Sequence, residues 1–313
     1  MALLIAIADW DDAAWAEALA VLRARTPLRI WPDLGEPADI RYALAWKAPY
    51  GLMASLPNLK AIISMGAGVD HLLADPGLPA VPIVRYSAED LRLRMRDYIV
   101  QNVMMHLRRH ADYAAQQRER VWRELAQPLA SEVRVGFMGL GNMASGAIET
   151  LAAMGFPLAG WARSPRPDTP FPVFAGRGQL PAFLERTDIL VCTLPLTPET
   201  RGILNAALLR GLARGGALPG PVLINAGRGG LQVEADILAC LADGTLHATS
   251  LDVFEEEPLP ATSPLWAHPR VFVTPHNAAW SSPLAVARFA LKQIDIMEAG
   301  GTPASLADRA RGY

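Results

Sequence analysis

Short apolar runs alternate with longer amphipathic segments along nearly the whole chain, and this rhythm constrains the fold more than any other feature. In the first hundred residues the apolar runs are Leu3–Ala8, Leu28–Trp31, Tyr42–Trp46, Ala61–Ser64 and Pro82–Arg85. Helix-like stretches such as Asp11–Ala24 separate them. A strand–helix–strand rhythm of this kind predicts a parallel sheet with helices on both faces.

The pattern changes in the middle of the chain and then resumes. Residues 88–126 contain no Pro or Gly and carry apolar residues at helical spacing, which predicts one or two long helices capped by Ser87. The runs that follow predict the strands Val133–Met138, Pro157–Ala162, Ile189–Thr193, Val222–Ala226, His247–Val253 and Val271–Thr274. A last helical segment begins near Ser282. The chain therefore contains two alternating blocks, as expected for about two domains of roughly 150 residues each.

Composition and charge exclude several functional classes. Of 313 residues 51% are hydrophobic and 19% are charged, and the formal net charge is −2. This is enough apolar material for sizeable cores, so the chain is not a disordered one. Nucleic acids and anionic membrane surfaces both attract a basic excess, which is absent here, and neither is predicted as a partner.

Cysteine usage and apolar run lengths point to an ordinary cytoplasmic protein. Cys192 and Cys240 lie in apolar runs and predict buried, unreactive thiols. The chain shows no Cys/His cluster at zinc spacing, so no metal site is predicted. The apolar run at the N-terminus is short and is followed at once by acidic residues, which argues against a signal peptide. No apolar run has the roughly 18 residues of a membrane span.

A glycine-rich turn follows the first strand of the second block. In the segment Val135–Ala144, Gly139 permits a tight turn and Gly141 lets the backbone approach a pyrophosphate, while Ala144 is small enough for close helix–strand packing. The anion would lie on the N-terminus of the next helix. Because the flanking strand and helix are both present, the motif predicts dinucleotide binding.

The end of the next strand indicates which dinucleotide is bound. Enzymes that use NAD place an acidic residue about 20 residues past the glycines, on the ribose 2′-hydroxyl. Here the strand ends at Ala162 and is followed by Arg163, Ser164 and Arg166. Arg and Ser bind a 2′-phosphate, which an acid would repel. We therefore predict NADP(H) in preference to NAD(H).

Three further strands end in polar residues: Arg228 follows one, Asp252 and Glu257 follow another, and His276 follows a third. Ligands of open α/β sheets bind at the carboxyl ends of the strands. An Arg holds a carboxylate through two bonds, and a carboxylate beside a His favours the protonated imidazole, a usable acid near neutral pH. Taken singly, each residue also fits a structural role, and Glu257 belongs to an acidic run typical of a solvated surface.

Several ordered segments resemble one family. They include SMGAGVDHLL at 64–73, VGFMGLGNMA at 135–144, GWARSPR at 160–166, LPLTPETRGI at 194–203, INAGRGG at 224–230, LDVFEEEPLP at 251–260 and SPLWAHPRVFVTPHNAA at 263–279. Together they resemble the D-isomer-specific 2-hydroxyacid dehydrogenases, and among these the NADPH-dependent glyoxylate/hydroxypyruvate reductases. The chain departs from the common form in carrying Ala144 at the third glycine position and Ala162 in place of the acidic ribose ligand.

The resemblance implies roles for individual residues. Arg228 would bind the substrate carboxylate and carbonyl oxygen, His276 would protonate that oxygen, and Glu257 would keep His276 protonated. The backbone of Gly66, Ala67 and Gly68 would hold the substrate carboxylate, and Trp46 would form a wall of the pocket. The implied cofactor-binding residues are Gly139, Gly141, Asn142, Met143, Arg163, Ser164, Arg166, Leu194, Pro195, Thr200, Ala226, Gly227, Arg228, Asp252 and His276. Asp252 would accept from the nicotinamide carboxamide, and Trp122 and Tyr313 are further pocket candidates without an assigned role.

The resemblance also implies an architecture and an activity. Two doubly wound α/β domains would face each other across a cleft: a flavodoxin-like substrate domain of residues 1–98 and 285–313, and a Rossmann-type NADP domain of residues 99–284. The 88–126 region would help to form a homodimer. The expected reaction is reduction of glyoxylate or hydroxypyruvate by NADPH. Two alternatives remain open, namely a family member specific for another 2-oxo acid and a nucleotide-sensing binding protein on the same fold, as in the C-terminal-binding-protein corepressors.

Overall fold

The computed structural model describes residues 1–8 and 11–313, and these form two compact units. Unit 1 comprises Met1–Asp90 and Ser281–Tyr313, and unit 2 comprises Leu91–Trp280. The first unit is thus built from two separate stretches of chain. The unit boundaries fall at 90/91 and 280/281, whereas the sequence suggested 98/99 and 284/285.

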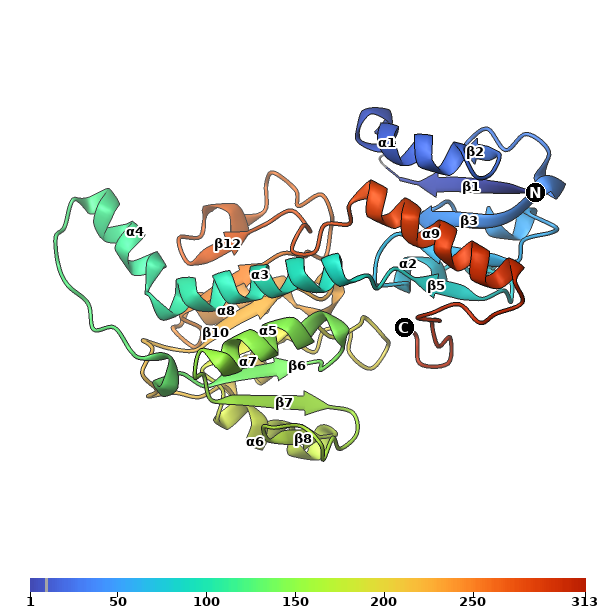
Figure 1. The fold of residues 1–313 in the computed structure, drawn as a ribbon. Helices are drawn as coiled ribbons and strands as arrows, with labels where there is room; N and C mark the ends of the chain where they lie inside the picture. The colour runs from blue at the N-terminus through green and yellow to red at the C-terminus, as the bar shows by residue number, and fades with distance from the viewer. Residues whose placement is uncertain (9–10) are drawn as a thin grey trace. The chain divides into compact units, whose positions relative to one another are not determined.

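Unit 1 contains a five-stranded parallel sheet in the order β2-β1-β3-β4-β5 (Figure 1). This is the flavodoxin-like order of a doubly wound sheet. Its strands are β1 (Ala2–Ile7), β2 (Leu28–Ile30), β3 (Ile40–Trp46), β4 (Ala61–Ser64) and β5 (Ile83–Arg85), and its helices are α1 (Asp12–Arg23), α2 (Asp70–Leu73) and α9 (Pro283–Glu298). The C-terminal helix α9 packs against α1, so the end of the chain completes the unit in which the chain began.

Unit 2 contains a seven-stranded parallel sheet in the order β12-β11-β10-β9-β6-β7-β8. When the strands are renumbered along the chain from β6, this order matches the Rossmann order, with β12 as one additional strand at the edge. The strands are β6 (Val135–Met138), β7 (Leu158–Ala162), β8 (Val173–Ala175), β9 (Ile189–Cys192), β10 (Val222–Asn225), β11 (Ala248–Leu251) and β12 (Val271–Val273). The helices are α3 (Glu89–Leu107, which starts in unit 1), α4 (His110–Glu119), α5 (Asn142–Ala153), α6 (Leu180–Glu185), α7 (Ala206–Arg210) and α8 (Glu234–Ala242).

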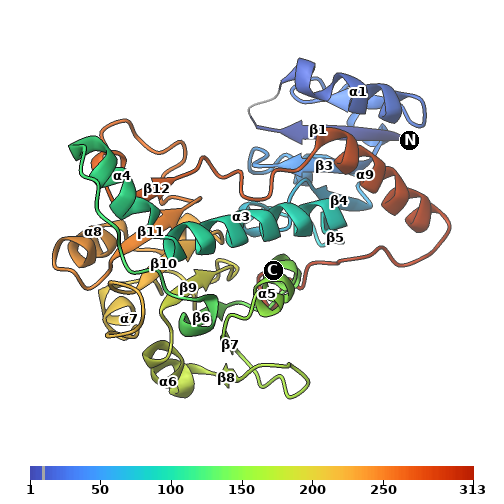
Figure 2. The same ribbon diagram turned by 60° about the vertical axis from the view of Figure 1, so that its left-hand side comes forward.

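Alternate residues of the central strands of unit 2 face two separate cores. Phe137 and Val191 pack with α3 and α5 on one face of the sheet. Met138 and Cys192 pack with α6, α7 and α8 on the other face. Figure 2 shows the helices on both sides of these strands. Burial on both faces explains why the strands are continuous apolar runs and were recognisable in the sequence.

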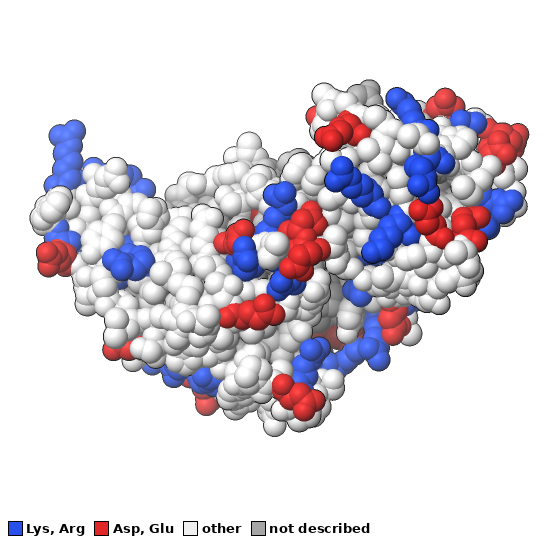
Figure 3. All heavy atoms as spheres, in the orientation of Figure 1, with Lys and Arg blue, Asp and Glu red and all other residues white. Residues whose placement is uncertain are grey.

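Within the described residues, the regular structure also includes six short 3₁₀ turns: Pro37–Asp39, Met53–Ser55, Ala130–Glu132, Arg177–Gln179, Gly229–Leu231 and Pro264–Ala267. The predicted strands are present, each within a few residues of its expected bounds. The short edge strand β8 was not predicted from the sequence. Positive and negative side chains are interspersed on the face shown in Figure 3, as expected from a net charge of −2.

The predicted helical region 88–126 is shorter than expected. It divides at Arg109 (φ 57°) and ends at Glu119, after which Arg120 (φ 57°) is left-handed. Residues 121–129 have no regular structure. Ser87 was also wrongly expected to cap the helix, because it lies two residues before the first helical residue and its hydroxyl pairs with that of Ser305.

A charged cluster holds the start of α4 against the amino-terminal edge of the sheet. Asp112 receives a hydrogen bond from Arg109 Nε at 3.0 Å, and its carboxylate lies 3.2 Å from Arg270 Nη2 and 3.6 Å from His247 Nε2. Arg270 and His247 directly precede β12 and β11. Burial would raise the pKa of Asp112, but the hydrogen bond from Arg109 and the charges of His247 and Arg270 outweigh it and lower that pKa below the usual value.

Replacing Asp112 with Asn should lower the free energy of unfolding by about 1–3 kcal/mol at pH 7, since the cationic Arg109 and Arg270 lose their carboxylate partner. A lowered folded-state pKa contributes stability above the unfolded value of about 3.9, and this contribution is lost as the pH falls through the folded value. The difference between variant and wild type should therefore shrink below about pH 4. Urea unfolding of both proteins at several pH values measures this difference in the free energy of unfolding. Asp97→Asn is the control, because Asp97 forms an exposed pair with Arg96; a difference as large at pH 3 as at pH 7 would contradict this assignment.

Candidate active site

The glycine turn predicted from the sequence lies between β6 and α5. Gly139 has φ +97°, and a Cβ there would come within 3.0 Å of the Thr193 carbonyl carbon. Gly141 is the N-cap of α5, and a Cβ on it would meet no atom within 4 Å. Ala144 is fully buried against the sheet. The first turn of α5, with Asn142 and Met143, thus presents helix-terminal N–H groups toward open space, which fits the pyrophosphate of a dinucleotide.

The strand next to this turn ends in basic residues. Arg163, Ser164 and Arg166 follow β7 and are exposed. Arg166 Nη1 donates to the carbonyl oxygen of Leu140 at 3.1 Å, which ties this loop to the glycine turn. The arginine loop therefore lies beside the turn that would hold the pyrophosphate, where a ribose 2′-phosphate would be bound.

Two more loops border the same edge of the sheet. After β9, Thr200 Oγ1 donates to the Pro195 carbonyl oxygen at 2.8 Å and shapes the 194–200 loop. After β10, Ala226 and Gly227 are buried, and a Cβ on Gly227 would come within 2.8 Å of the Leu194 carbonyl oxygen. The absence of a side chain at Gly227 allows these two loops to pack directly together.

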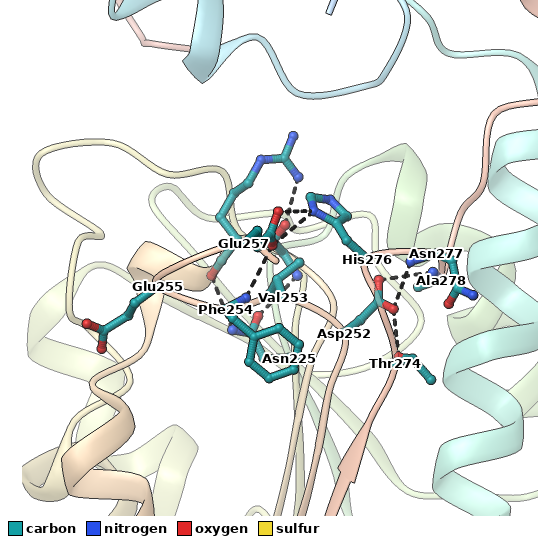
Figure 4. Close-up of polar contacts among 12 residues, drawn as sticks. Asn225, Asp252, Val253, Phe254, Glu255, Glu257, Thr274, His276, Asn277 and Ala278 are labelled. Atoms are coloured by element: carbon teal, nitrogen blue, oxygen red, sulfur yellow. Dashed lines mark hydrogen bonds and ion pairs between the residues drawn. The ribbon is translucent and has the colours of Figure 1, made fainter. Parts of the chain in front are cut away.

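The predicted contact between His276 and Glu257 is present in the structure. His276 Nδ1 lies 2.9 Å from Glu257 Oε2 and 3.0 Å from Glu257 Oε1 (Figure 4). Glu257 Oε1 also accepts from the Phe254 backbone N–H at 3.2 Å. The His276 side chain is 30% exposed, so its ring can meet a substrate while Glu257 engages one nitrogen. This pair leaves Nε2 as the ring atom that would exchange a proton.

The His276 backbone conformation is set by Asp252. His276 has φ +52°, a left-handed value uncommon for a non-glycine residue. Its N–H donates to the Asp252 carbonyl oxygen at 2.8 Å. The buried Asp252 carboxylate accepts from Thr274 Oγ1 at 2.7 Å, from the Asn277 N–H at 3.0 Å and from the Ala278 N–H at 2.9 Å. Burial raises the pKa of Asp252 in spite of these bonds. The Asp252 carboxylate therefore holds the turn that contains His276. The contact of Asp252 with nicotinamide stays a prediction.

Arg228 is the residue before the Gly229–Leu231 turn that follows β10, and it is half-buried. Its Nη1 donates to the Gly227 carbonyl oxygen at 2.7 Å. Like Glu257 and His276, it follows a strand of the central parallel sheet at the carboxyl edge. All three catalytic candidates therefore come from the edge at which open α/β sheets bind ligands.

The substrate-side candidates of unit 1 form their own cluster. Trp46 ends β3, and a Cβ on Gly66 would lie 2.6 Å from the Cζ3 atom of its indole. Trp46 also contacts His71 with the two rings tilted by 59° and their centroids 4.6 Å apart. Ser64 Oγ donates to the Gly68 carbonyl oxygen at 3.2 Å and fixes the loop that contains Ala67. A glycine at 66 is required for the indole to lie against this loop.

Other residues singled out in the sequence are accounted for. Cys192 and Cys240 are buried as predicted, and burial raises the pKa of the Cys192 thiol to about 12. Tyr313 pairs its backbone with that of Asp308. Trp122 is 99% exposed on the segment after α4. Among the described residues, no helix combines the length and the apolar character that crossing a bilayer requires.

Comparisons with known proteins place this chain in a family. A family model described as the NAD binding domain of D-isomer specific 2-hydroxyacid dehydrogenases matches residues 100–278. Glyoxylate/hydroxypyruvate reductase A of Yersinia enterocolitica is 39% identical over 304 residues, which cover 94% of this chain and 95% of that protein. The chain belongs to the D-isomer specific 2-hydroxyacid dehydrogenase family. It is therefore an oxidoreductase, as the motifs predicted.

Solved structures of this family share the fold over the whole chain. The NADPH-dependent glyoxylate/hydroxypyruvate reductase of Sinorhizobium meliloti, in complex with NADP and sulfate, has a TM-score of 0.94 and 43% identity, covering 100% of this chain and 99% of that one. A probable 2-hydroxyacid dehydrogenase of Rhizobium etli, in complex with NADP, HEPES and L(+)-tartaric acid, has a TM-score of 0.93 and 41% identity over 100% and 99% of the two chains. The predicted α/β fold class is thereby confirmed.

Proposed function

We propose that this 2-hydroxyacid dehydrogenase reduces glyoxylate and hydroxypyruvate with NADPH. The observation that carries the proposal is the Glu257–His276 pair on the same sheet edge as the Gly139–Ala144 turn. Relatives named as glyoxylate/hydroxypyruvate reductases, and neighbours solved with NADP or NADPH, support the substrate class and the cofactor.

Each polar residue has a distinct part in the reaction. NADPH, when bound, supplies the hydride that adds to the carbonyl carbon. The Arg228 guanidinium binds the substrate carboxylate and stabilises the negative charge that develops on the carbonyl oxygen. His276 gives the proton from Nε2 to that oxygen, while Glu257 holds Nδ1 and orients the ring. Hydride and proton together convert the 2-oxo acid to the 2-hydroxy acid.

A substrate panel tests the proposal directly. NADPH oxidation is followed at 340 nm with glyoxylate, hydroxypyruvate, pyruvate and phenylpyruvate. We expect kcat/KM to be highest for the first two. Turnover with the aryl acid alone would contradict the proposed specificity, and no turnover with any of them would favour a nucleotide-sensing binding protein.

Arg163 and Arg166 should determine the preference for NADPH over NADH. Replacing both with Ala removes two charged partners of the 2′-phosphate, each worth about 1.5–3 kcal/mol. We expect kcat/KM for NADPH to fall by at least about tenfold while that for NADH changes little. Arg210→Ala is the matched control, because Arg210 is an exposed arginine of unit 2 on α7, in a long contact with Asp243. A wild-type protein that uses NADH better than NADPH would contradict the assignment.

We also infer that two copies of the chain associate through the α3–α4 region. The segment that follows α4 carries three exposed apolar side chains, Val121, Trp122 and Leu129, which are 44%, 99% and 68% exposed. Tyr113 accepts from the Leu125 N–H and Gln116 accepts from the Arg123 N–H, so this segment is folded against α4. Sedimentation velocity measures the oligomeric state directly. We expect a dimer in the wild type and a weaker one in Trp122→Ala; a monomer at micromolar concentration would contradict the inference.

A further inference from the structure

Two buried amide side chains lie beneath the catalytic edge of unit 2. Asn225 ends β10 and is 0% exposed, and Gln232 follows the Gly229–Leu231 turn and is 2% exposed. Asn225 Nδ2 donates to Gln232 Oε1 at 2.8 Å. Neither residue was assigned a role from the sequence.

The amide pair connects two loops that carry the catalytic candidates. At one end, Asn225 Nδ2 donates to the Arg228 carbonyl oxygen at 3.2 Å. At the other end, Gln232 Nε2 donates to the Val253 carbonyl oxygen at 2.9 Å. The chain of hydrogen bonds therefore runs from the backbone of Arg228 to the backbone that leads to Glu257.

The loop that contains Val253 is connected to His276 through Glu257. Phe254, the residue after Val253, donates its N–H to Glu257 Oε1 at 3.2 Å, and Glu257 in turn engages His276 Nδ1 at 2.9 Å (Figure 4). The two loops also pack backbone against backbone, because a Cβ on Gly229 would lie 1.7 Å from the Phe254 carbonyl oxygen. A displacement of one loop must therefore move the other.

Buried amides are retained only where their hydrogen bonds are made, because an unpaired one is costly. An apolar residue at 232 would fill a similar volume, but it would leave Asn225 Nδ2 and the Val253 carbonyl oxygen without this partner. Such a residue would also remove the directional constraint on the spacing of the two loops. A fully paired polar network of this kind specifies one arrangement of the groups that it joins.

We propose that Gln232, together with Asn225, is a positioning residue that sets Glu257, and through it His276, relative to Arg228. The proposal rests on the proposed function, because it gives Gln232 its effect through the proton-donating pair. The expected consequence is a selective loss of catalytic rate. A misplacement of about 1 Å at a reacting group can cost about 10²-fold in rate.

The main test variant is Gln232→Met, which keeps length and approximate volume but removes the amide. Full-length protein is assayed with NADPH and glyoxylate, and circular dichroism and thermal unfolding establish that it is folded. We expect kcat to fall by about tenfold or more while KM for NADPH stays within about twofold, since the Gly139–Ala144 turn is a separate loop. Should Gln232→Met fail to fold, Gln232→Asn replaces it, because the shorter amide keeps its polarity but cannot reach both partners.

A matched variant separates this effect from the loss of any buried amide. Gln293 on α9 of unit 1 is also 2% exposed, and its Oε1 accepts from the Ala304 N–H at 2.8 Å. Gln293→Met should lower the stability without a comparable loss of kcat. An equal kcat loss in both variants would show that Gln232 has only a structural role and would overturn the proposal.

The route through Glu257 is tested by a double-mutant cycle. In a Glu257→Gln background, Gln232→Met should have little further effect on kcat, because the group that it positions has already been altered. Independent, multiplicative losses would overturn the proposal, as would a Gln232→Met enzyme with wild-type kcat. Wild-type protein without turnover on any 2-oxo acid is a different outcome, which contradicts the proposed function itself and the inference with it.

Discussion

Replacing His276 with Gln is expected to lower kcat for the reduction of glyoxylate by about 10²–10⁴-fold, the range for loss of a general acid. Glutamine has a similar size and can still hydrogen-bond Glu257, but it has no proton to give to the carbonyl oxygen. In the proposed mechanism, the contact of 2.9 Å between Nδ1 and Glu257 Oε2 would orient the imidazole so that Nε2 carries the proton to be transferred. Steady-state kinetics at saturating NADPH measure the effect.

A second histidine of unit 2 provides the control. His268 lies before β12, and its Nδ1 accepts from the Arg270 N–H at 3.3 Å, so it has a partner away from the Glu257 carboxylate. His268→Gln should leave kcat within about twofold of wild type, as expected for a residue outside the proton-transfer path. Near-normal turnover by the His276→Gln enzyme would remove the histidine from the mechanism. The source of the proton would then have to be sought elsewhere.

The central sheets were predictable from the sequence for a physical reason. Strands such as β1 and β6 are buried on both faces, so nearly every residue in them is apolar and each forms a continuous run. The polar residues that follow the runs mark the strand ends, and the parallel topology brings those ends to one edge. This explains why Arg228, Glu257 and His276 could be chosen before their positions were known.

The end of the α3–α4 region was not predictable from the same signals. Its breaks occur at Arg109 and Arg120, which adopt positive φ although neither is glycine or asparagine. No Pro or Gly marks these positions. The first break coincides with the ion cluster around Asp112, whose partners Arg270 and His247 lie far away in the sequence. Tertiary contacts therefore override the local helical pattern.

Parts of the site also depend on contacts that a sequence does not reveal. The carboxylate of Asp252, for which the sequence predicts only a contact with nicotinamide, also holds the turn that contains His276. Gln232 would ordinarily be taken for a surface residue, because glutamine is mostly exposed in proteins. Its burial follows from the fold of the 228–232 turn onto the Val253–Phe254 backbone.

The same packing makes Gly229 the most restrictive position near the site. A Cβ at this residue would lie 1.7 Å from the Phe254 carbonyl oxygen, 1.9 Å from its carbonyl carbon and 2.7 Å from the Glu255 nitrogen. All three are backbone atoms, so no flexible side chain can move aside. Gly229→Ala must therefore separate the loop of Arg228 from the loop that leads to Glu257.

We expect Gly229→Ala to lower kcat/KM for glyoxylate by about 10²-fold, as for a misplacement of about 1 Å. We also expect it to lower the free energy of unfolding by about 1–3 kcal/mol, as for overpacking of a buried site. Gly178→Ala is the control, because a Cβ there would meet no atom within 4 Å and its φ lies outside the left-handed region. Kinetics and urea unfolding of both variants measure the two effects. The loss of activity should exceed what partial unfolding explains, because the folded Gly229→Ala enzyme would still hold Arg228 and Glu257 too far apart. A variant that is destabilised but has normal kcat/KM per folded molecule would show that the loop spacing does not limit catalysis.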